Sequence, residues 1–176
     1  MNCIVIGKGR AGAARARTIQ ESARCVLVRH ISGREFQGPQ ALDQSLYFIC
    51  TENKKHYSTA KNILQCGHHV VVEFPPCMTQ KEWDVLESLA REKSLIIHCG
   101  LIGLYSKQHK HRKQWLLEQS VQEVFVDFSG GLYRWVQEEA NLEHIPQLAF
   151  GRIAALWDLF GPLTAQRVLL EKEDSC

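Results

Sequence analysis

The sequence predicts an α/β protein whose centre is a doubly wound parallel sheet, and three observations carry this prediction. Short apolar runs recur along the 176 residues, and several are followed by a segment with helical periodicity. These runs are nearly continuous rather than alternating, which is typical of strands buried on both faces. A glycine-rich turn joins the first run to the first helix. The length allows one such domain plus part of a second.

Composition excludes several classes of protein. With 45% hydrophobic and 23% charged residues, the chain has the balance of a globular protein. A net charge of +2 is too small to indicate nucleic acid as the main partner, and the basic cluster at 107–113 is interpreted as a solvated helix face. No apolar run reaches the length of a membrane span, and no signal peptide precedes the first strand. We therefore expect a cytoplasmic protein with no nucleic-acid or membrane partner.

The cysteines do not form a pattern that predicts a disulfide framework or a metal site. They are odd in number and none are spaced as CxxC. We expect reduced, mostly buried thiols that pack as small hydrophobes. The seven are Cys3, Cys25, Cys50, Cys66, Cys77, Cys99 and Cys176.

The first element is a strand over Asn2–Ile6, and it leads directly into a G-x-G-x-x-G turn that opens a helix at 13–20. The first glycine permits a tight turn, the second lets a pyrophosphate approach the backbone, and the third lets helix and strand pack closely. The phosphates then lie at the helix N-terminus. The alternative is a purely structural glycine turn. The candidate cofactor-binding residues here are Gly7, Gly9, Arg10, Ala11 and Gly12.

The second strand, Cys25–Ile31, ends in a turn that bears on the choice of cofactor. A protein specific for NAD places an acidic residue near this point to bind the ribose hydroxyls. Here Ser32 and Arg34 occupy the turn, and a hydroxyl plus a guanidinium suits a 2′-phosphate. Glu35 favours the opposite choice, because its carboxylate could bind the ribose. The sequence favours NADP and leaves NAD open.

After a link at 36–45 that is too short for a helix plus a strand, residues 47–76 form one βαβ unit. An apolar run ends at Cys50, a helix follows over 54–66, and a second strand over 69–72 stops at Glu73-Phe74-Pro75. Ligands bind beyond the carboxyl ends of such strands. The candidates at these two ends are Thr51, Glu52, Asn53 and Glu73.

Three further elements complete the nucleotide-binding domain, which we place at residues 1–119. Thr79 and Glu82 have the spacing of a capping box and begin an amphipathic helix. Leu95–His98 is the next buried strand, and a helix follows over 107–118.

The pattern changes after Ser120. Val121–Phe128 alternates apolar and polar side chains, which predicts a strand with two different faces. A helix over Ala149–Phe160 and a strand over Leu163–Leu170 follow. We interpret 120–176 as the beginning of a truncated α+β domain. Exposed strand edges in such a domain need to be covered by more chain, a protein partner or a second copy.

Several motifs now resemble the glucose–fructose oxidoreductase/inositol dehydrogenase (Gfo/Idh/MocA) family. Residues 49–56 (ICTENKKH), 66–70 (CGHHV) and 73–75 (EFP) are similar to three successive motifs of its nucleotide-binding half. Within the family the biliverdin reductase group is the most similar. Its features are the aromatic residue in Glu-x-Pro, the turn at 32–35 (SGRE) and the helix at 151–161 (GRIAALWDLFG).

The resemblance implies a Rossmann fold and reduction of a linear tetrapyrrole, biliverdin to bilirubin, with hydride from NADPH. The nicotinamide would lie near Thr51, Asn53, Glu73 and Phe74. Arg152 would lie on the substrate side, where it could pair with a propionate. Of the histidines at strand ends, His56 would help to position the cofactor loop, and the others are interpreted as satisfied polar residues.

Three departures from the family keep a second hypothesis open. Phe74 replaces a lysine or tyrosine and cannot transfer a proton. Residues 99–104 lack ionisable side chains other than a thiol, where the reductases have an acidic, histidine-containing run. The chain also ends early in the family's second domain. The alternative is a catalytically inactive relative that binds a nucleotide and acts through protein partners.

Overall fold

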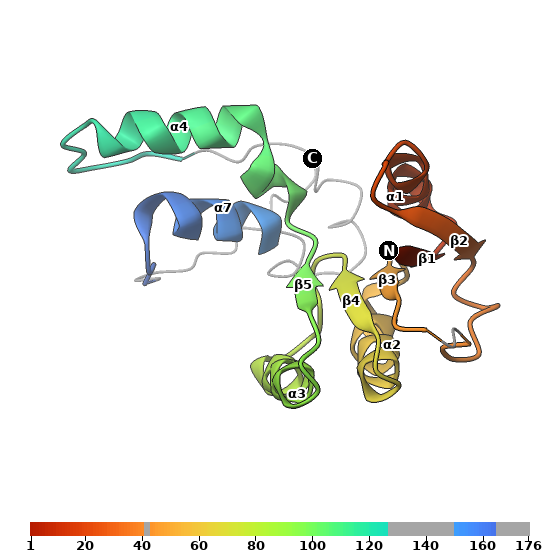
Figure 1. Cartoon of the computed structure of the whole chain (residues 1–176). Helices are drawn as coiled ribbons and strands as arrows, with labels where there is room; N and C mark the ends of the chain where they lie inside the picture. The colour runs from red at the N-terminus through yellow and green to blue at the C-terminus, as the bar shows by residue number, and fades with distance from the viewer. Residues whose placement is uncertain (41–42, 127–149, 165–176) are drawn as a thin grey trace, which may run out of the picture.

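The computed structural model describes residues 1–40, 43–126 and 150–164, and its centre is a parallel sheet (Figure 1). In this part of the chain the sheet has five strands in the order β2-β1-β3-β4-β5, and every neighbouring pair is parallel. The predicted doubly wound α/β fold is confirmed. The elements are β1 (Asn2–Ile6), α1 (Arg10–Gln20), β2 (Val26–Ile31), β3 (Leu46–Ile49), α2 (Asn53–Gln65), β4 (His69–Val72), α3 (Gln80–Glu92), β5 (Ile97–Cys99), η1 (Ile102–Tyr105), α4 (Lys107–Leu117) and α7 (Phe150–Phe160).

The strand order changes direction at β1, because β2 lies on one side of it and β3 on the other. Right-handed crossovers in opposite directions put helices on opposite faces of the sheet. Figure 1 shows this arrangement, with α1 on one face and α2 and α3 on the other. The crevice between the carboxyl ends of β1 and β3 is the switch point at which such sheets bind ligands.

Two apolar clusters fill the space between the sheet and its helices. On the α1 face, Cys3 and Val5 of β1 pack against Ala16 and Ile19. The cluster on the other face is larger, because two helices cover four strands there. Its buried members are Ile4, Ile6, Tyr47, Ile49, Ala60, Ile63, Leu64, Val70, Val72, Leu86, Ala90 and Leu95.

Backbone hydrogen bonds join the loops that leave the strands into one edge. The residue that follows each of β1, β3, β4 and β5 donates its N–H to the last carbonyl of the neighbouring strand. These bonds run from Gly7 to Ile31 (2.7 Å), Cys50 to Ile6 (2.8 Å), Glu73 to Ile49 (2.9 Å) and Gly100 to Val72 (2.7 Å). The four loops therefore meet in one place.

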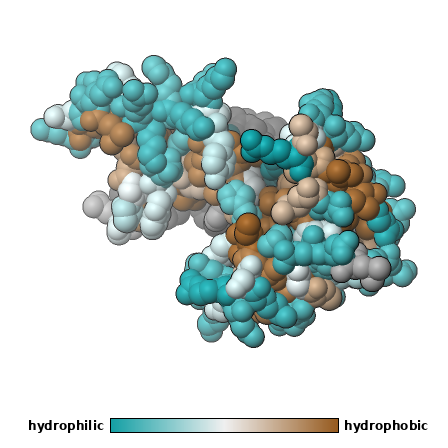
Figure 2. All heavy atoms as spheres, in the orientation of Figure 1, coloured by the Kyte–Doolittle hydropathy of each residue, from teal (hydrophilic) through white to brown (hydrophobic). Residues whose placement is uncertain are grey.

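The outer strands are less buried than the sequence predicted. Leu95–His98 was expected to be a buried strand, but β5 begins at Ile97 and is the edge of the sheet, with Ile96 59% exposed. On the opposite edge, Val26 and Val28 of β2 are exposed, and Figure 2 shows hydrophobic surface on that side of the molecule. A continuous apolar run fits both an edge and a central strand, so periodicity alone could not separate them.

The C-terminal part corrects one prediction and confirms two. The helices predicted at 107–118 and 149–160 are present as α4 and α7, and α4 has a largely hydrophilic surface in Figure 2. Residues 121–126, predicted as a strand, form no strand, and Phe125 is 94% exposed. Alternation marks two faces, but a strand also needs a neighbour for its backbone hydrogen bonds. The strand predicted at 163–170 lies mostly outside the described residues.

The described cysteines are free, but they are less buried than expected. Cys3 is buried and Cys66 is exposed, whereas the other four are half-buried. The sheet edges explain this difference, because Cys25 and Cys99 lie next to or on the outer strands. Among the described residues, no group of histidine, cysteine and carboxylate side chains could hold a metal ion. None of the helices described there is long and apolar enough to cross a membrane.

His68 joins the amino ends of β3 and β4 and should make stability depend on pH. Its Nδ1 accepts the backbone N–H of Ser45 (3.3 Å), and its ring packs on Tyr47. Burial lowers the pKa of His68, and the charge of His69 lowers it further. The ring of His68 thus takes up a proton less readily in the folded chain than in the unfolded chain. The contribution of His68 is complete above the unfolded pKa, about 6.5, and is lost as pH falls below it.

His68→Asn keeps an acceptor near the Nδ1 position but cannot take up the proton. We expect the wild-type chain to lose more unfolding free energy than the variant between about pH 7.5 and about pH 5.5. Urea unfolding at both pH values measures the difference. Equal losses in the two proteins would contradict the assignment to His68.

Candidate functional site

The carboxyl ends of β1, β2 and β3 open on a groove of about 480 Å³. Six of the predicted cofactor residues line it, namely Gly7, Gly9, Ser32, Arg34, Thr51 and Glu52. The other lining residues are Lys8, Gly33, Cys50 and Lys55. The sequence therefore identified most of the backbone of the groove and missed two of its lysines.

The three glycines of the first loop differ in what a side chain at each position would meet. Gly7 has a φ of +121°, and a Cβ there would lie 2.1 Å from the carbonyl oxygen of Cys50. A Cβ on Gly12 would lie 1.7 Å from the carbonyl oxygen of Gly7. At Gly9 a Cβ would meet nothing within 4 Å. Packing alone thus requires glycine at positions 7 and 12, whereas position 9 borders open space in the groove.

His30 supports the glycine loop from β2. Its Nε2 lies 2.9 Å from the carbonyl oxygen of Gly7, which can only accept, so the ring donates from Nε2. His30 was not among the residues predicted for the site. In the structure it positions the turn, and it does not line the groove.

The turn after β2 is a capping box that engages Glu35. The Glu35 carboxylate accepts the backbone N–H of Ser32 (2.6 Å), while Ser32 Oγ accepts the N–H of Glu35 (3.3 Å). Lys8 Nζ lies 3.6 Å from the same carboxylate. The hydrogen bonds of Ser32, followed by the charge of Lys8, lower the pKa of Glu35. Glu35 is thus ionised and bound within the turn, and Arg34 rather than Glu35 lines the groove.

Thr51 supplies a polar atom whose partner is absent from the described part of the chain. Its Oγ1 is buried and has no hydrogen-bond partner there. A buried hydroxyl without a partner is costly and calls for an explanation. Together with the open space at Gly9, this hydroxyl fits a groove shaped for a polar ligand such as a dinucleotide.

His56 lies beneath the groove and joins its two walls. It is 1% exposed, and its ring nitrogens lie 2.7 Å from the carbonyl oxygen of Pro75 and 3.0 Å from that of Thr51. The side chain therefore positions the loops after β3 and β4 relative to each other. The sequence predicted that His56 helps to position the cofactor loop, and its place among the cofactor-binding residues remains a prediction.

Glu73 is tied to α1 by an ion pair. Arg15 Nε and Nη2 both approach Glu73 Oε1, at 2.8 and 2.7 Å, and the two side chains are 20% and 16% exposed. Gly100 leaves room for the pair, because a Cβ there would lie 3.0 Å from the Arg15 guanidinium. The carboxylate proposed for catalysis or cofactor binding thus links the glycine-loop helix to the corner at 73–75.

The thiols nearest this corner are not activated nucleophiles. Burial, and then the charge of Glu73, raises the pKa of both Cys50 and Cys99 to about 12. Both are thus protonated at neutral pH, and a protonated thiol is a poor nucleophile. The arrangement favours binding and orientation over covalent catalysis.

A second cavity of about 270 Å³ adjoins the corner. It lies between Phe74, the segment around η1 and the start of α7. The ring of Phe74 is 39% exposed, and its edge carbons lie 3.5 Å from the position of a Cβ on Gly151. The residues that line the cavity are Phe74, Leu101, Gly103, Leu104, Gly151 and Arg152. This apolar pocket brings together Phe74, which the sequence placed near the nicotinamide, and Arg152, which it placed on the substrate side.

The remaining predicted site residues do not line the groove. They are Arg10, Ala11, Gly12, Asn53, His56 and Glu73. Four of these begin helices α1 and α2 or lie one to two residues inside them, because the helices start directly at the groove. Their predicted roles toward a cofactor remain predictions.

The ion pair between Arg15 and Glu73 should contribute to stability. Arg15→Met leaves a largely buried carboxylate without its partner, so we expect the free energy of unfolding to fall by about 1–3 kcal/mol. In Arg15→Met/Glu73→Gln the charge is removed as well, so part of this loss should be recovered. Urea unfolding of the three proteins measures both effects. If Arg15→Met stayed within about 0.5 kcal/mol of wild type, the pair would have no such role.

Comparison with known proteins agrees with this geometry. Residues 35–101 match the model of the GFO_IDH_MocA family, described as an oxidoreductase family with an NAD-binding Rossmann fold. The chain is 26% identical to biliverdin reductase A of Mus musculus and 25% identical to that of Homo sapiens, in each case over 97% of this chain. It spans 62% of the length of these two reductases.

A solved structure shows the same similarity. A biliverdin reductase of Synechocystis sp. PCC 6803, crystallised with biliverdin and NADP+, superposes with a TM-score of 0.73 and 26% identity. The superposition covers 93% of this chain and 59% of that one. On these matches the chain is similar to biliverdin reductases, and residues 35–101 are similar to the NAD-binding Rossmann fold of the GFO/IDH/MocA oxidoreductase family.

Proposed function

We propose that this chain is an NADPH-dependent oxidoreductase of the biliverdin reductase type, which reduces a linear tetrapyrrole, biliverdin to bilirubin. The observation that carries the proposal is the adjacency of a polar groove and an apolar pocket at one edge of the sheet. The groove is lined by the glycine loop and by the polar turns after β2 and β3, where a dinucleotide would bind, and the pocket lies beyond β4 and β5 at the same edge of the sheet. NADPH when bound would supply the hydride, so the protein needs mainly to orient the two reactants.

The groove supports NADPH over NADH as the preferred cofactor. Glu35 is engaged by Ser32 and Lys8, so its carboxylate is not oriented toward a ribose hydroxyl. Arg34, Lys8 and Lys55 line the groove and offer positive charge to a 2′-phosphate. The Synechocystis reductase named above was crystallised with NADP+, which supports the same choice.

The pocket supports a flat, apolar acceptor that carries a carboxylate. Phe74 offers an exposed ring face or edge for packing, and Arg152 contributes a cation to the lining. Phe74 cannot donate a proton, so the acid would be water or an acidic group of the substrate. The absence of a tyrosine hydroxyl at position 74 would weaken proton delivery without abolishing hydride transfer.

The second candidate is a catalytically inactive relative that binds a nucleotide and acts through a protein partner or a second copy. Phe74 at the corner favours it, because the position keeps its packing without its proton chemistry. A stable stoichiometric complex together with no change in biliverdin absorbance in the presence of NADPH would favour this candidate. A cytoplasmic location fits either function and remains a prediction.

Alanine at two glycine positions separates the cofactor site from the fold. Gly9 borders open space at φ −73°, so Gly9→Ala should leave stability within about 1 kcal/mol of wild type. Its methyl group would occupy the space proposed for the pyrophosphate, so NADPH affinity should fall at least about tenfold. Gly12→Ala should instead reduce stability, because its Cβ collides with the Gly7 carbonyl.

NADPH and NADH titrations followed by cofactor fluorescence, with thermal unfolding of each variant, measure both effects. Wild-type chain that binds neither cofactor at about millimolar concentration would exclude the proposed enzyme. Unchanged NADPH affinity in Gly9→Ala would remove the glycine loop from the binding site.

Phe74→Tyr tests whether proton delivery limits the reaction. The Cζ atom of Phe74 faces Gly151 at the wall of the apolar pocket, so a hydroxyl there would enter the proposed substrate site. We expect turnover of biliverdin to rise by about a hundredfold, the lower end of the range for one general acid. Phe74→Leu is the matched control, since it changes packing without adding a donor. Unchanged turnover in Phe74→Tyr with intact NADPH binding would show that proton delivery does not limit the reaction.

A further inference from the structure

Helix α7 carries a carboxylate where a helix least favours one. Apart from Arg152, Asp158 is the charged residue of the helix, and it lies in the last turn. A negative charge there faces the negative end of the helix dipole. A carboxylate at this position destabilises the helix, so the contacts that Asp158 makes with other elements indicate its role.

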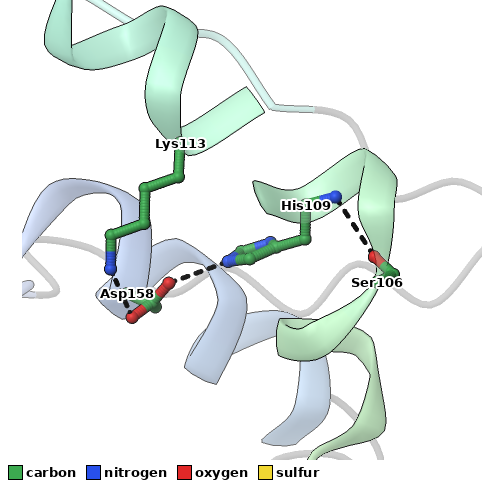
Figure 3. Close-up of polar contacts among 4 residues, drawn as sticks. All are labelled: Ser106, His109, Lys113 and Asp158. Atoms are coloured by element: carbon green, nitrogen blue, oxygen red, sulfur yellow. Dashed lines mark hydrogen bonds and ion pairs between the residues drawn. The ribbon is translucent and has the colours of Figure 1, made fainter. Parts of the chain in front are cut away.

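Asp158 is bound by two residues of α4 (Figure 3). Its Oδ2 lies 2.8 Å from His109 Nε2, and its Oδ1 accepts from Lys113 Nζ at 2.7 Å. His109 and Lys113 are four residues apart and therefore share one face of α4. These hydrogen bonds, from Lys113 first and then from His109, lower the pKa of Asp158. The carboxylate is thus ionised at neutral pH.

The cluster is more than a surface ion pair, because its histidine is buried. The side chain of His109 is 6% exposed, against 34% for Asp158 and 44% for Lys113. Exposed pairs contribute little to stability, whereas a buried donor that loses its acceptor carries the full desolvation cost. The contact between His109 and Asp158 is therefore the part that holds the helices together.

The two helices joined by this cluster also carry the two walls of the apolar pocket. Ser106 caps α4 by accepting the N–H of His109 (3.1 Å), and α4 follows η1 directly. Leu101, Gly103 and Leu104, in and beside η1, form one wall. Gly151 and Arg152, at the start of α7, form the wall that packs against Phe74. Asp158 lies seven residues, about 10 Å along the helix axis, from Gly151.

We propose that Asp158 is a positioning residue: by holding α7 to α4 through His109 and Lys113, it sets the width of the apolar pocket over Phe74. A helix moves as a rigid rod over this length, so loss of the cluster at one end lets the other end tilt away from η1. The identity of the pocket's ligand rests on the proposed function, whereas the contacts that hold α7 to α4 do not depend on it.

Asp158→Asn removes the charge with little change in shape. We expect faster hydrogen–deuterium exchange in the segments that carry the two walls, relative to wild type: at the amides of 102–105, and at those of 154–156, which in a helix donate to the carbonyls of 150–152. The dissociation constant for biliverdin should rise about tenfold, whereas that for NADPH should not change, since the groove residues lie on other loops. His109→Gln retains an N–H near the Nε2 position and should approach wild-type values, whereas His109→Ala should resemble Asp158→Asn. Glu87→Gln, which removes an exposed ion pair on α3, is the control and should change nothing.

The two readouts separate failure of this inference from failure of the proposed function. If wild-type chain does not bind biliverdin, the proposed substrate is wrong, and exchange in the two walls alone decides the inference. Exchange that rises only beside residue 158, with residues 102–105 unchanged, would overturn the positioning role. An equal effect of Glu87→Gln would overturn it as well.

Discussion

The close approach of β1 and β3 at their carboxyl ends is the constraint on which the rest of the structure depends. The backbone of Gly7 lies so near the Cys50 carbonyl that no other residue fits, and α1 packs equally closely on Gly7 through Gly12. These contacts fix where α1 begins and where the loop after β3 leaves the sheet. The groove is therefore a consequence of backbone packing.

Charged and polar side chains near the groove mostly hold its loops in place. Arg15 pairs with Glu73, His30 supports Gly7, and His56 lies between the carbonyls of Thr51 and Pro75. Because each of these contacts joins segments far apart in the chain, the loops form one preorganised unit. Preorganisation lowers the cost of ordering the site when a ligand binds. Thr51 Oγ1 is the exception, a polar atom without a partner in the part of the chain that the structure describes.

Local patterns predicted the local features of this protein well. The glycine loop and the capping box of Thr79 with Glu82 are both present as expected. Ser32 and Glu35 have the same capping spacing in the sequence, but they were interpreted only as residues that could bind a cofactor. Contacts between distant residues could not be predicted, since nothing local to Arg15 indicates a carboxylate 58 positions away. The prediction of a strand at 121–128 was wrong over 121–126, the part that the structure describes, for the same reason, because pairing requires a neighbour that periodicity does not reveal.

The two halves of the site differ in what they demand of the side chains. The groove is formed by backbone and by several charged groups, so a substitution of one of its charged side chains leaves its shape intact, whereas Gly7 admits no side chain. The apolar pocket depends on the placement of Gly151 against the ring of Phe74, and that placement depends on how α7 is held. A phenyl ring satisfies this packing as well as a tyrosine does, so the corner at 73–75 keeps its shape although residue 74 cannot donate a proton. Binding of a flat acceptor and its turnover are thus separable properties here, and the packing at Phe74 bears on the first of them.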